Sequence, residues 1–338
     1  MSKEYNSIIS VKNLHKDFRI ARRGRGLKGA IRYLFSRKYT IKRAVNDISF
    51  EIAPGDMVGY IGRNGAGKST TIKMMTGILV PTSGEIVVDG IVPYKKRTLN
   101  GGKIGVVFGQ RTQLRWDIPV IESYRLLKEI YNIPIKVYKE NIEYFSYLLK
   151  LNNLLSIPAR KLSLGQRMQC DLVASFLHNP MIVYLDEPTI GMDIIGKENI
   201  RDFIKSINKE RGTTVILTTH DLTDFEDICK RAIIIDSGKK IYDGGFEKLD
   251  EQFGGYRILK FELKDTALSI EKFNSLPDGM EIISLENNYF KTRINKNIIS
   301  APEGIRFIID KVNCLDVSIE DTSIATTIKA IYRNGLKT

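Results

Sequence analysis

The segment "VGYIGRNGAGKSTTIKMM", from Val58 to Met75, is the feature that most restricts the fold of this chain. It consists of an apolar run, a glycine-rich loop at 62–69 and a run with helical character. Glycine lets a backbone turn sharply and point its N–H groups into one concavity, between a strand on one side and a helix on the other. The segment therefore predicts a strand–loop–helix unit of an α/β domain.

Strand-like and helical runs alternate along the first 250 residues. Between about 114 and 160, apolar residues recur at three- and four-residue spacing, which predicts helices. The alternation predicts a largely parallel sheet within a domain over 1–250, with a helical subdomain at about 112–180. The other expected strands lie at 7–18, 43–52, 84–90, 103–109, 181–185 and 213–220.

A second unit is expected over 251–338, after the Gly-Gly turns. Strand-like runs at 256–263, 279–286, 289–295 and 315–321 enclose helical runs at 267–276 and 301–313. The order strand, helix, strand, strand, helix, strand is that of a small α+β, ferredoxin-like unit. A last helix is expected at 323–335.

Composition excludes several classes of protein. With 43% apolar and 27% charged residues, the 338-residue chain is typical of globular proteins. Its three cysteines, Cys170, Cys229 and Cys314, lie far apart without a CxxC pair, which argues against disulfides and metal sites. The N-terminus does not resemble a signal peptide, and no apolar run reaches the length that spans a membrane, about 18 residues or more.

The loop "GRNGAGKS" fits the phosphate-binding pattern G-x-x-x-x-G-K-[ST]. Its backbone N–H groups would hold phosphates, Lys68 would reach the β- and γ-phosphates, and Ser69 would bind Mg²⁺. Thr70 begins a helix whose N-terminus favours anions. The alternative is a glycine-rich turn with an incidental lysine. The expected nucleotide-binding residues here are Gly62, Asn64, Gly65, Ala66, Gly67, Lys68, Ser69 and Thr70.

Two acidic residues end the apolar run "MIVYLDEPT". Asp186, at a strand end, is suited to holding Mg²⁺, and Glu187 to orienting or deprotonating an attacking water. Alone, they could equally be two solvated acids. Beside a phosphate-binding loop, they indicate nucleotide hydrolysis.

The run "LSLGQRM" offers a hydroxyl, backbone N–H groups and a helix N-terminus to a phosphate through Ser163, Gly165 and Gln166. It resembles the LSGGQ signature of ATP-binding cassette (ABC) ATPases, with Leu164 where glycine is commonest. By itself, such a pentapeptide would be an ordinary helix cap.

Further motifs match that family in order, over about 8–250. The resemblance implies that Gln110 is the Q-loop glutamine and a Mg²⁺ ligand, that Asp193 is the D-loop aspartate, and that His220 is the switch histidine near the γ-phosphate. Tyr39, 29 residues before Lys68, matches the aromatic residue that stacks on adenine.

Three details concern where the chain departs from the family and what it shares with one branch. Arg63 stands where proline is common, at a position that usually faces away from the nucleotide, so no role is assigned to it. The chain resembles a bacterial branch of ATPases that serve ABC-2 type exporters. The resemblance lies in the insertion before Tyr39, in "LFSRKY", "VVFGQRTQLRWDIPV" and "LSLGQRM", and in the C-terminal "LDVSIEDTSIATTIKAIY". In that tail, Ala325 replaces a common glutamate.

The resemblance implies a function and partners. One phosphate loop and one signature form half of a site, so two chains would hold two ATP molecules in a head-to-tail dimer. We expect a cytoplasmic ATPase at the inner face of the membrane, which uses ATP and Mg²⁺ to power a separate membrane permease. The alternative is a soluble ABC ATPase acting on nucleic acid or ribosomes. Such proteins usually have two cassettes or a long coiled-coil insertion, and neither is present here.

The segment at 19–38 contains eight lysines and arginines and no acid, which is +8 of the net charge of +13. Leu27, Ile31, Leu34 and Phe35 form an apolar stripe, so a basic amphipathic helix is predicted. Such a helix suits an anionic membrane surface or an acidic groove of a partner. A solvated helix packed on its own sheet is the alternative, and no nucleic-acid partner is expected.

Removing charge from this segment tests the membrane hypothesis. Each basic residue near an anionic bilayer contributes about 1 kcal/mol, so five substitutions to glutamine should weaken flotation with anionic liposomes or with the permease, and wild-type flotation should be sensitive to salt. ATP binding should be unchanged. Equal flotation of mutant and wild type at low salt would favour the solvated helix. The substituted residues are Arg22, Arg23, Arg25, Lys28 and Arg32.

Overall fold

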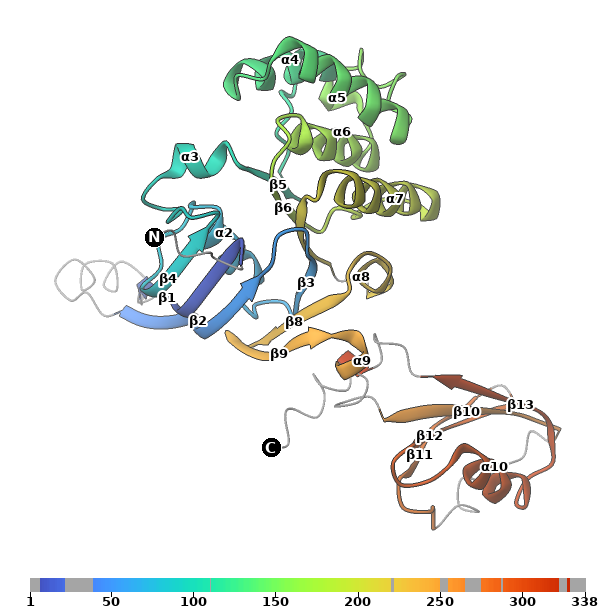
Figure 1. Cartoon of the computed structure of the whole chain (residues 1–338). Coiled ribbons are helices and arrows are strands. Elements are labelled where there is room, and N and C mark those ends of the chain that lie inside the picture. The colour runs from blue at the N-terminus through green and yellow to red at the C-terminus, as the bar shows by residue number, and fades with distance from the viewer. Residues whose placement is uncertain are drawn as a thin grey trace, which may run out of the picture. The chain divides into compact units, whose positions relative to one another are not determined.

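The computed structural model divides the chain into two compact units, Met1–Gly244 and Gly245–Thr338 (Figure 1). The described residues are 7–21, 39–109, 111–219, 222–249, 255–264, 275–286, 288–321 and 327–328. The basic stretch at 22–38, Ala325, and most of the helices expected at 267–276 and 323–335 lie outside them. In the described parts, no helix has the length and hydrophobicity needed to cross a bilayer.

A six-stranded sheet forms the centre of the first unit. Its order is β5 (Ile104–Phe108), β6 (Ile182–Asp186), β7 (Thr214–Thr218), β3 (Met57–Gly62), β8 (Arg231–Asp236) and β9 (Lys239–Gly245). The pairs from β5 to β8 are parallel, so their carboxyl ends lie at one edge of the sheet. The predicted strand–helix alternation is confirmed. β8 and β9, which follow each other across a short turn, were not among the strands expected from the sequence.

A second, three-stranded sheet of the same unit differs from the expectation of one largely parallel sheet. Its order is β2 (Tyr39–Ile52), β1 (Ile9–Ala21) and β4 (Ser83–Val88), and both pairings are antiparallel. β1 and β2 pair from Ile9 opposite Ile52 to Ala21 opposite Tyr39. Antiparallel strands can pair without a crossover helix, whereas the parallel strands of the central sheet require such connections.

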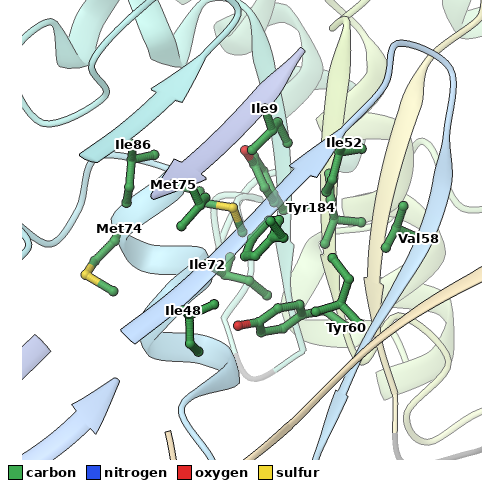
Figure 2. Close-up of a cluster of buried hydrophobic side chains, with 14 of the residues drawn as sticks. Ile9, Ile48, Ile52, Val58, Tyr60, Ile72, Met74, Met75, Ile86 and Tyr184 are labelled. Carbon is green, nitrogen blue, oxygen red and sulfur yellow. The ribbon is translucent and has the colours of Figure 1, made fainter. Parts of the chain in front are cut away.

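The main core lies between the two sheets and α2 (Lys68–Met75) (Figure 2). Ile9, Ile48 and Ile86 come from the antiparallel sheet, while Tyr60 and Tyr184 come from β3 and β6. All five side chains are at most 1% exposed. Their burial packs β3 against the antiparallel sheet and so positions the loop that follows β3.

Four helices form a further layer of the unit. They are α4 (Val120–Ile130), α5 (Ile135–Leu148), α6 (Leu164–Phe176) and α7 (Ile194–Arg211), and α4, α5 and α6 gather at one end of Figure 1. Phe145, Phe176 and Phe203, from three of these helices, meet edge to face with ring centroids 5.3–6.3 Å apart. The short helices of this unit include α3 (Arg97–Gly101) and α8 (Leu222–Ile228), while α9 (Phe246–Leu249) belongs to the second unit.

The second unit contains the predicted four-stranded antiparallel sheet. Its strands are β10 (Tyr256–Leu263), β11 (Met280–Glu286), β12 (Tyr289–Asn295) and β13 (Cys314–Asp321), in the order β11-β12-β10-β13. α10 (Ala301–Ile309) packs on this sheet through Ile308 against a core that includes Phe261 and Phe290. Strand order and α10 confirm the ferredoxin-like arrangement in the described residues.

His178 joins the helical layer to the sheet and makes the stability of the first unit sensitive to pH. Its ring stacks on Tyr131 at 4.0 Å between centroids, and its Nε2 lies 3.0 Å from the Ile104 carbonyl oxygen. Burial lowers the pKa of His178, and the contact with that carbonyl only partly opposes the shift. Below pH about 6.5, the ordinary pKa of histidine, the unfolded chain therefore binds more protons than the folded chain.

We expect His178→Phe to keep the stacking but lose the contact with Ile104, at a cost of about 1 kcal/mol at pH 7.5. Because the wild type loses stability as the pH falls through about 6.5 and the variant does not, the difference in unfolding free energy should shrink at pH 5.5. Urea denaturation of both proteins at the two pH values measures it. A difference that stays constant would contradict the role assigned to His178.

Candidate functional site

The glycine-rich loop connects the end of β3 at Gly62 to the start of α2 at Lys68. Gly67 precedes the helix at φ +108°, and a Cβ there would lie 2.5 Å from the Ala44 carbonyl oxygen. Only glycine accepts both that dihedral angle and that contact. The close approach seats the loop on β2 and directs the N-terminus of α2 into a cavity.

Lys68 is anchored at the base of this cavity. Its Nζ donates hydrogen bonds to the carbonyl oxygens of Gly62 at 2.5 Å and of Arg63 at 3.3 Å, and the residue is 8% exposed. Burial lowers the pKa of the Lys68 ammonium, while the nearby carboxylates of Glu187 and Asp186 act in the opposite direction. A phosphate group would supply the negative charge that this buried cation lacks in the loop.

Asp186 connects three elements of the site. Ser69 Oγ, on α2, donates to Asp186 Oδ2 at 3.2 Å, and the Thr218 hydroxyl, at the end of β7, donates to Asp186 Oδ1. The Gly109 N–H, after β5, donates to the Asp186 carbonyl oxygen at 2.8 Å. Because β7 lies between β6 and β3, Asp186 reaches Ser69 across the end of a neighbouring strand.

Glu187 adopts a left-handed backbone with φ +58°, which is uncommon for a residue other than glycine. Its N–H donates to the Thr218 carbonyl oxygen at 2.9 Å. The carboxylates of Asp186 and Glu187 therefore extend from differently shaped stretches of backbone. Both residues are half-buried and line the cavity.

The cavity has a volume of about 1170 Å³ and is open to solvent. Arg63, expected to face away, lines it. Tyr39 does not, and its side chain is 45% exposed; the aromatic residues in the lining are Phe18 and Phe108. The lining residues are Phe18, Arg19, Ile20, Lys42, Ala44, Arg63, Asn64, Gly65, Gly67, Lys68, Ser69, Thr70, Lys73, Ile78, Leu79, Phe108, Gly109, Arg111, Asp186 and Glu187.

The predicted signature lies elsewhere in the unit. Ser163 caps α6: its side chain accepts a hydrogen bond from the Gln166 N–H at 3.2 Å, and the Gln166 side chain accepts one from the Ser163 N–H at 3.0 Å. Ser163 and Gln166 are exposed, and neither they nor Gly165 line the cavity. Asp193, also exposed, caps α7 through the Gly196 N–H at 2.7 Å.

Two of the expected site residues, Gln110 and His220, lie outside the described residues. Phe18 and Thr218 were not expected at the site from the sequence. Phe18 ends the run "KNLHKDF" and could have been found as the aromatic residue nearest the end of the first expected strand. Nothing in the sequence marks Thr218 as a partner of Asp186, because that contact exists only once β6 and β7 are paired.

The oxygens at this site fit a magnesium ion. Ser69 offers a hydroxyl and Asp186 a carboxylate, and both are hard oxygen ligands. Ser69 Oγ and Asp186 Oδ2 lie 3.2 Å apart. Among the described residues, no group of three or more His, Cys, Asp or Glu side chains could hold a metal without further ligands. Magnesium commonly completes its coordination with phosphate oxygens and water, which this open cavity admits.

Known proteins are similar to this chain in sequence and in fold. Residues 45–190 match the family model described as "ABC transporter". The ABC transporter ATP-binding protein NatA of Bacillus subtilis is 32% identical over 217 residues, which cover 64% of this chain and 88% of NatA. The bacitracin transport ATP-binding protein BcrA of Bacillus licheniformis is 30% identical over 234 residues, covering 68% of this chain and 73% of BcrA.

A similar fold occurs in a solved structure described as a dimeric, post-hydrolysis state of the ATP-binding cassette MJ0796 bound to ADP and Pi. The two chains share 24% sequence identity with a TM-score of 0.59, and the match covers 70% of this chain and 98% of the other. At this identity, the likeness concerns the fold.

Because Phe18 lines the cavity and Tyr39 does not, we expect Phe18 to be the residue on which the base of ATP stacks. Stacking of a base on an aromatic ring contributes about 1–3 kcal/mol, so Phe18→Ala should weaken ATP binding roughly tenfold, whereas Tyr39→Ala should change it less than about twofold. Titration with a fluorescent ATP analogue measures both. Inorganic triphosphate, which has no base, should bind both variants like the wild type. A larger loss in Tyr39→Ala would reverse the assignment.

Proposed function

Because the chain belongs to the ABC transporter ATP-binding proteins, a family of ATPases that bind ATP, we propose that it is the ATP-hydrolysing subunit of an ABC-2 type exporter. The observation that carries this proposal is the convergence of Lys68, Ser69, Asp186 and Glu187 on one open cavity beside the N-terminus of α2. The similarity to BcrA, a protein named for bacitracin transport, supports a role in transport.

In this proposal, the candidate site residues have separate tasks in hydrolysis. The loop backbone and Lys68 hold the β- and γ-phosphates, and Phe18 stacks on the base. Ser69, Asp186 and Gln110 would hold the magnesium ion, which neutralises charge on the phosphate oxygens. Glu187 accepts the proton of the attacking water, and His220 contacts the γ-phosphate.

The cavity of one chain is half of the proposed site. Ser163 and Gln166 are exposed at the start of α6 and do not line the cavity of their own chain. A helix N-terminus attracts a phosphate, so this surface suits the γ-phosphate held by a second chain. Head-to-tail pairing would complete two sites at once, and Asp193 would lie at the same interface.

Transport itself would be performed by a separate membrane permease. ATP binding would close the dimer and change the conformation of the permease, and hydrolysis would reset both. The chain would then work in the cytoplasm at the inner face of the membrane, with the basic segment at 19–38 near anionic lipid. The exported substrate would be selected by the permease.

A pair of substitutions tests hydrolysis and pairing separately. Glu187→Gln keeps the size of the side chain but accepts no proton, so turnover should fall by about 10²–10⁴ while ATP still binds. ATP should then drive a stable dimer, because ligand stabilises the state that binds it. Light scattering measures the dimer.

Adding Ser163→Arg to Glu187→Gln should abolish that dimer, since a bulky cation replaces the hydroxyl offered to the second chain's nucleotide. Ser237→Arg, on an exposed turn outside the cavity and the signature, serves as the control and should leave the dimer intact. An ATP-dependent dimer that survives Ser163→Arg argues against head-to-tail pairing.

A further inference from the structure

A buried network of Thr189, Asp224 and Arg201 lies behind the candidate catalytic residues. Thr189 Oγ1 donates a hydrogen bond to Asp224 Oδ2 at 2.6 Å, and Arg201 Nη1 donates to Asp224 Oδ1 at 3.1 Å. Thr189 is 4% exposed, and the side chains of Asp224 and Arg201 are 1% and 14% exposed. A carboxylate this deeply buried requires such partners, because an unpaired buried charge is costly.

The network joins three segments that carry proposed site residues. Thr189 follows Glu187 by two positions. Asp224 lies on α8, which begins at Leu222, directly after the segment that contains His220. Arg201 lies on α7, whose cap is Asp193. The Asp224 side chain therefore links the segment after β6, which contains Thr189, to α7, which contains Arg201. Asp224 itself lies on the helix that follows β7.

Glu187 needs external support to keep its conformation. A residue other than glycine in the left-handed region is strained and persists only where its surroundings over-determine it. On its N-terminal side, the Glu187 N–H is bound to the Thr218 carbonyl oxygen at 2.9 Å. On its C-terminal side, the hydroxyl of Thr189 ties the chain to another segment through a buried hydrogen bond to Asp224.

We propose that Thr189 is a positioning residue, whose hydrogen bond to the Arg201-paired carboxylate of Asp224 holds Glu187 in the orientation that hydrolysis needs. The ion pair with Arg201 keeps Asp224 an acceptor, so the Thr189 hydroxyl must donate and its direction is fixed. Arg201 is itself oriented by a second acid, because its Nε lies 3.1 Å from Asp227 Oδ2. This inference rests on the proposed function, in which Glu187 is the base.

Steady-state hydrolysis by the full chain tests the inference with matched substitutions. Thr189→Val keeps the shape and removes the hydroxyl, whereas Thr189→Ser keeps the hydroxyl. Thr213→Val is the control, because Thr213 is also 4% exposed, its hydroxyl donates to the Pro180 carbonyl oxygen at 3.4 Å, and it does not line the cavity. A misplacement of the base should reduce kcat while leaving the binding of ATP intact.

We expect Thr189→Val to reduce kcat ten- to a hundredfold with KM within about threefold, and Thr189→Ser and Thr213→Val to stay within about threefold of the wild type. A purely structural role would instead lower the Tm and affect Thr189→Val and Thr213→Val alike. If Thr189→Val does not fold, Arg201→Lys tests the same inference. Lysine keeps the positive charge but cannot bind Asp224 and Asp227 with one planar group, so kcat should fall at least threefold.

Wild-type kcat in the folded Thr189→Val variant, or a loss that Thr189→Ser does not restore, overturns the inference. So does a rise in KM without a fall in kcat. Glu187→Gln is measured alongside: if it hydrolyses ATP normally, the proposed function has failed. If it is inactive while Thr189→Val is normal, only the positioning role of Thr189 is refuted.

Discussion

The carboxylate of Asp186 accepts hydrogen bonds from Ser69 on α2 and from Thr218 at the end of β7. The rest of the site depends on these two contacts, because they fix the end of β6 relative to the phosphate loop across an intervening strand. Three parallel strands are held at the same level there, and the cavity forms at their carboxyl ends. This is the edge at which open α/β sheets generally bind ligands.

Two acids that are adjacent in the chain thereby acquire different surroundings. Asp186 belongs to β6, and its side chain is engaged by Ser69 and Thr218. Glu187 leaves the strand in a left-handed conformation, so its side chain takes another direction into the same cavity. The strain of that turn is the reason that the chain needs supports on both sides of Glu187, from Thr218 and from the buried Asp224 network.

The separation of the cavity from the signature explains why the proposed activity requires two chains. α6 presents Ser163 and Gln166 to solvent, although a capping box already satisfies part of the helix N-terminus. Such a surface gains most when a phosphate approaches the remaining free N–H groups. ATP held by one chain would therefore join two surfaces that the fold of a single chain keeps apart.

The sequence by itself determined the strand–loop–helix unit and the alternation of strands and helices. It also determined the succession of strands and helices along the second unit and the pair Asp186–Glu187. Each of these depends on residues close together in the chain, such as Gly67 beside Lys68, whose chemistry is legible locally. The sequence also indicated the family. It did not show that the strands containing Ile9, Ile48 and Ile86 form a separate antiparallel sheet. The alternation of apolar and polar residues along a strand indicates which face is buried but not which strand is its partner.

Only the tertiary structure decided the contacts between distant segments. Tyr39 and Phe18 are both aromatic and both precede the loop, yet only Phe18 lines the cavity, because the pairing of β1 with β2 sets which side chains reach it. Thr189 and Asp224 are 35 residues apart and carry no motif that links them. Such contacts depend on how β6, β7 and α7 pack, and packing is a property of the whole fold that local sequence does not encode.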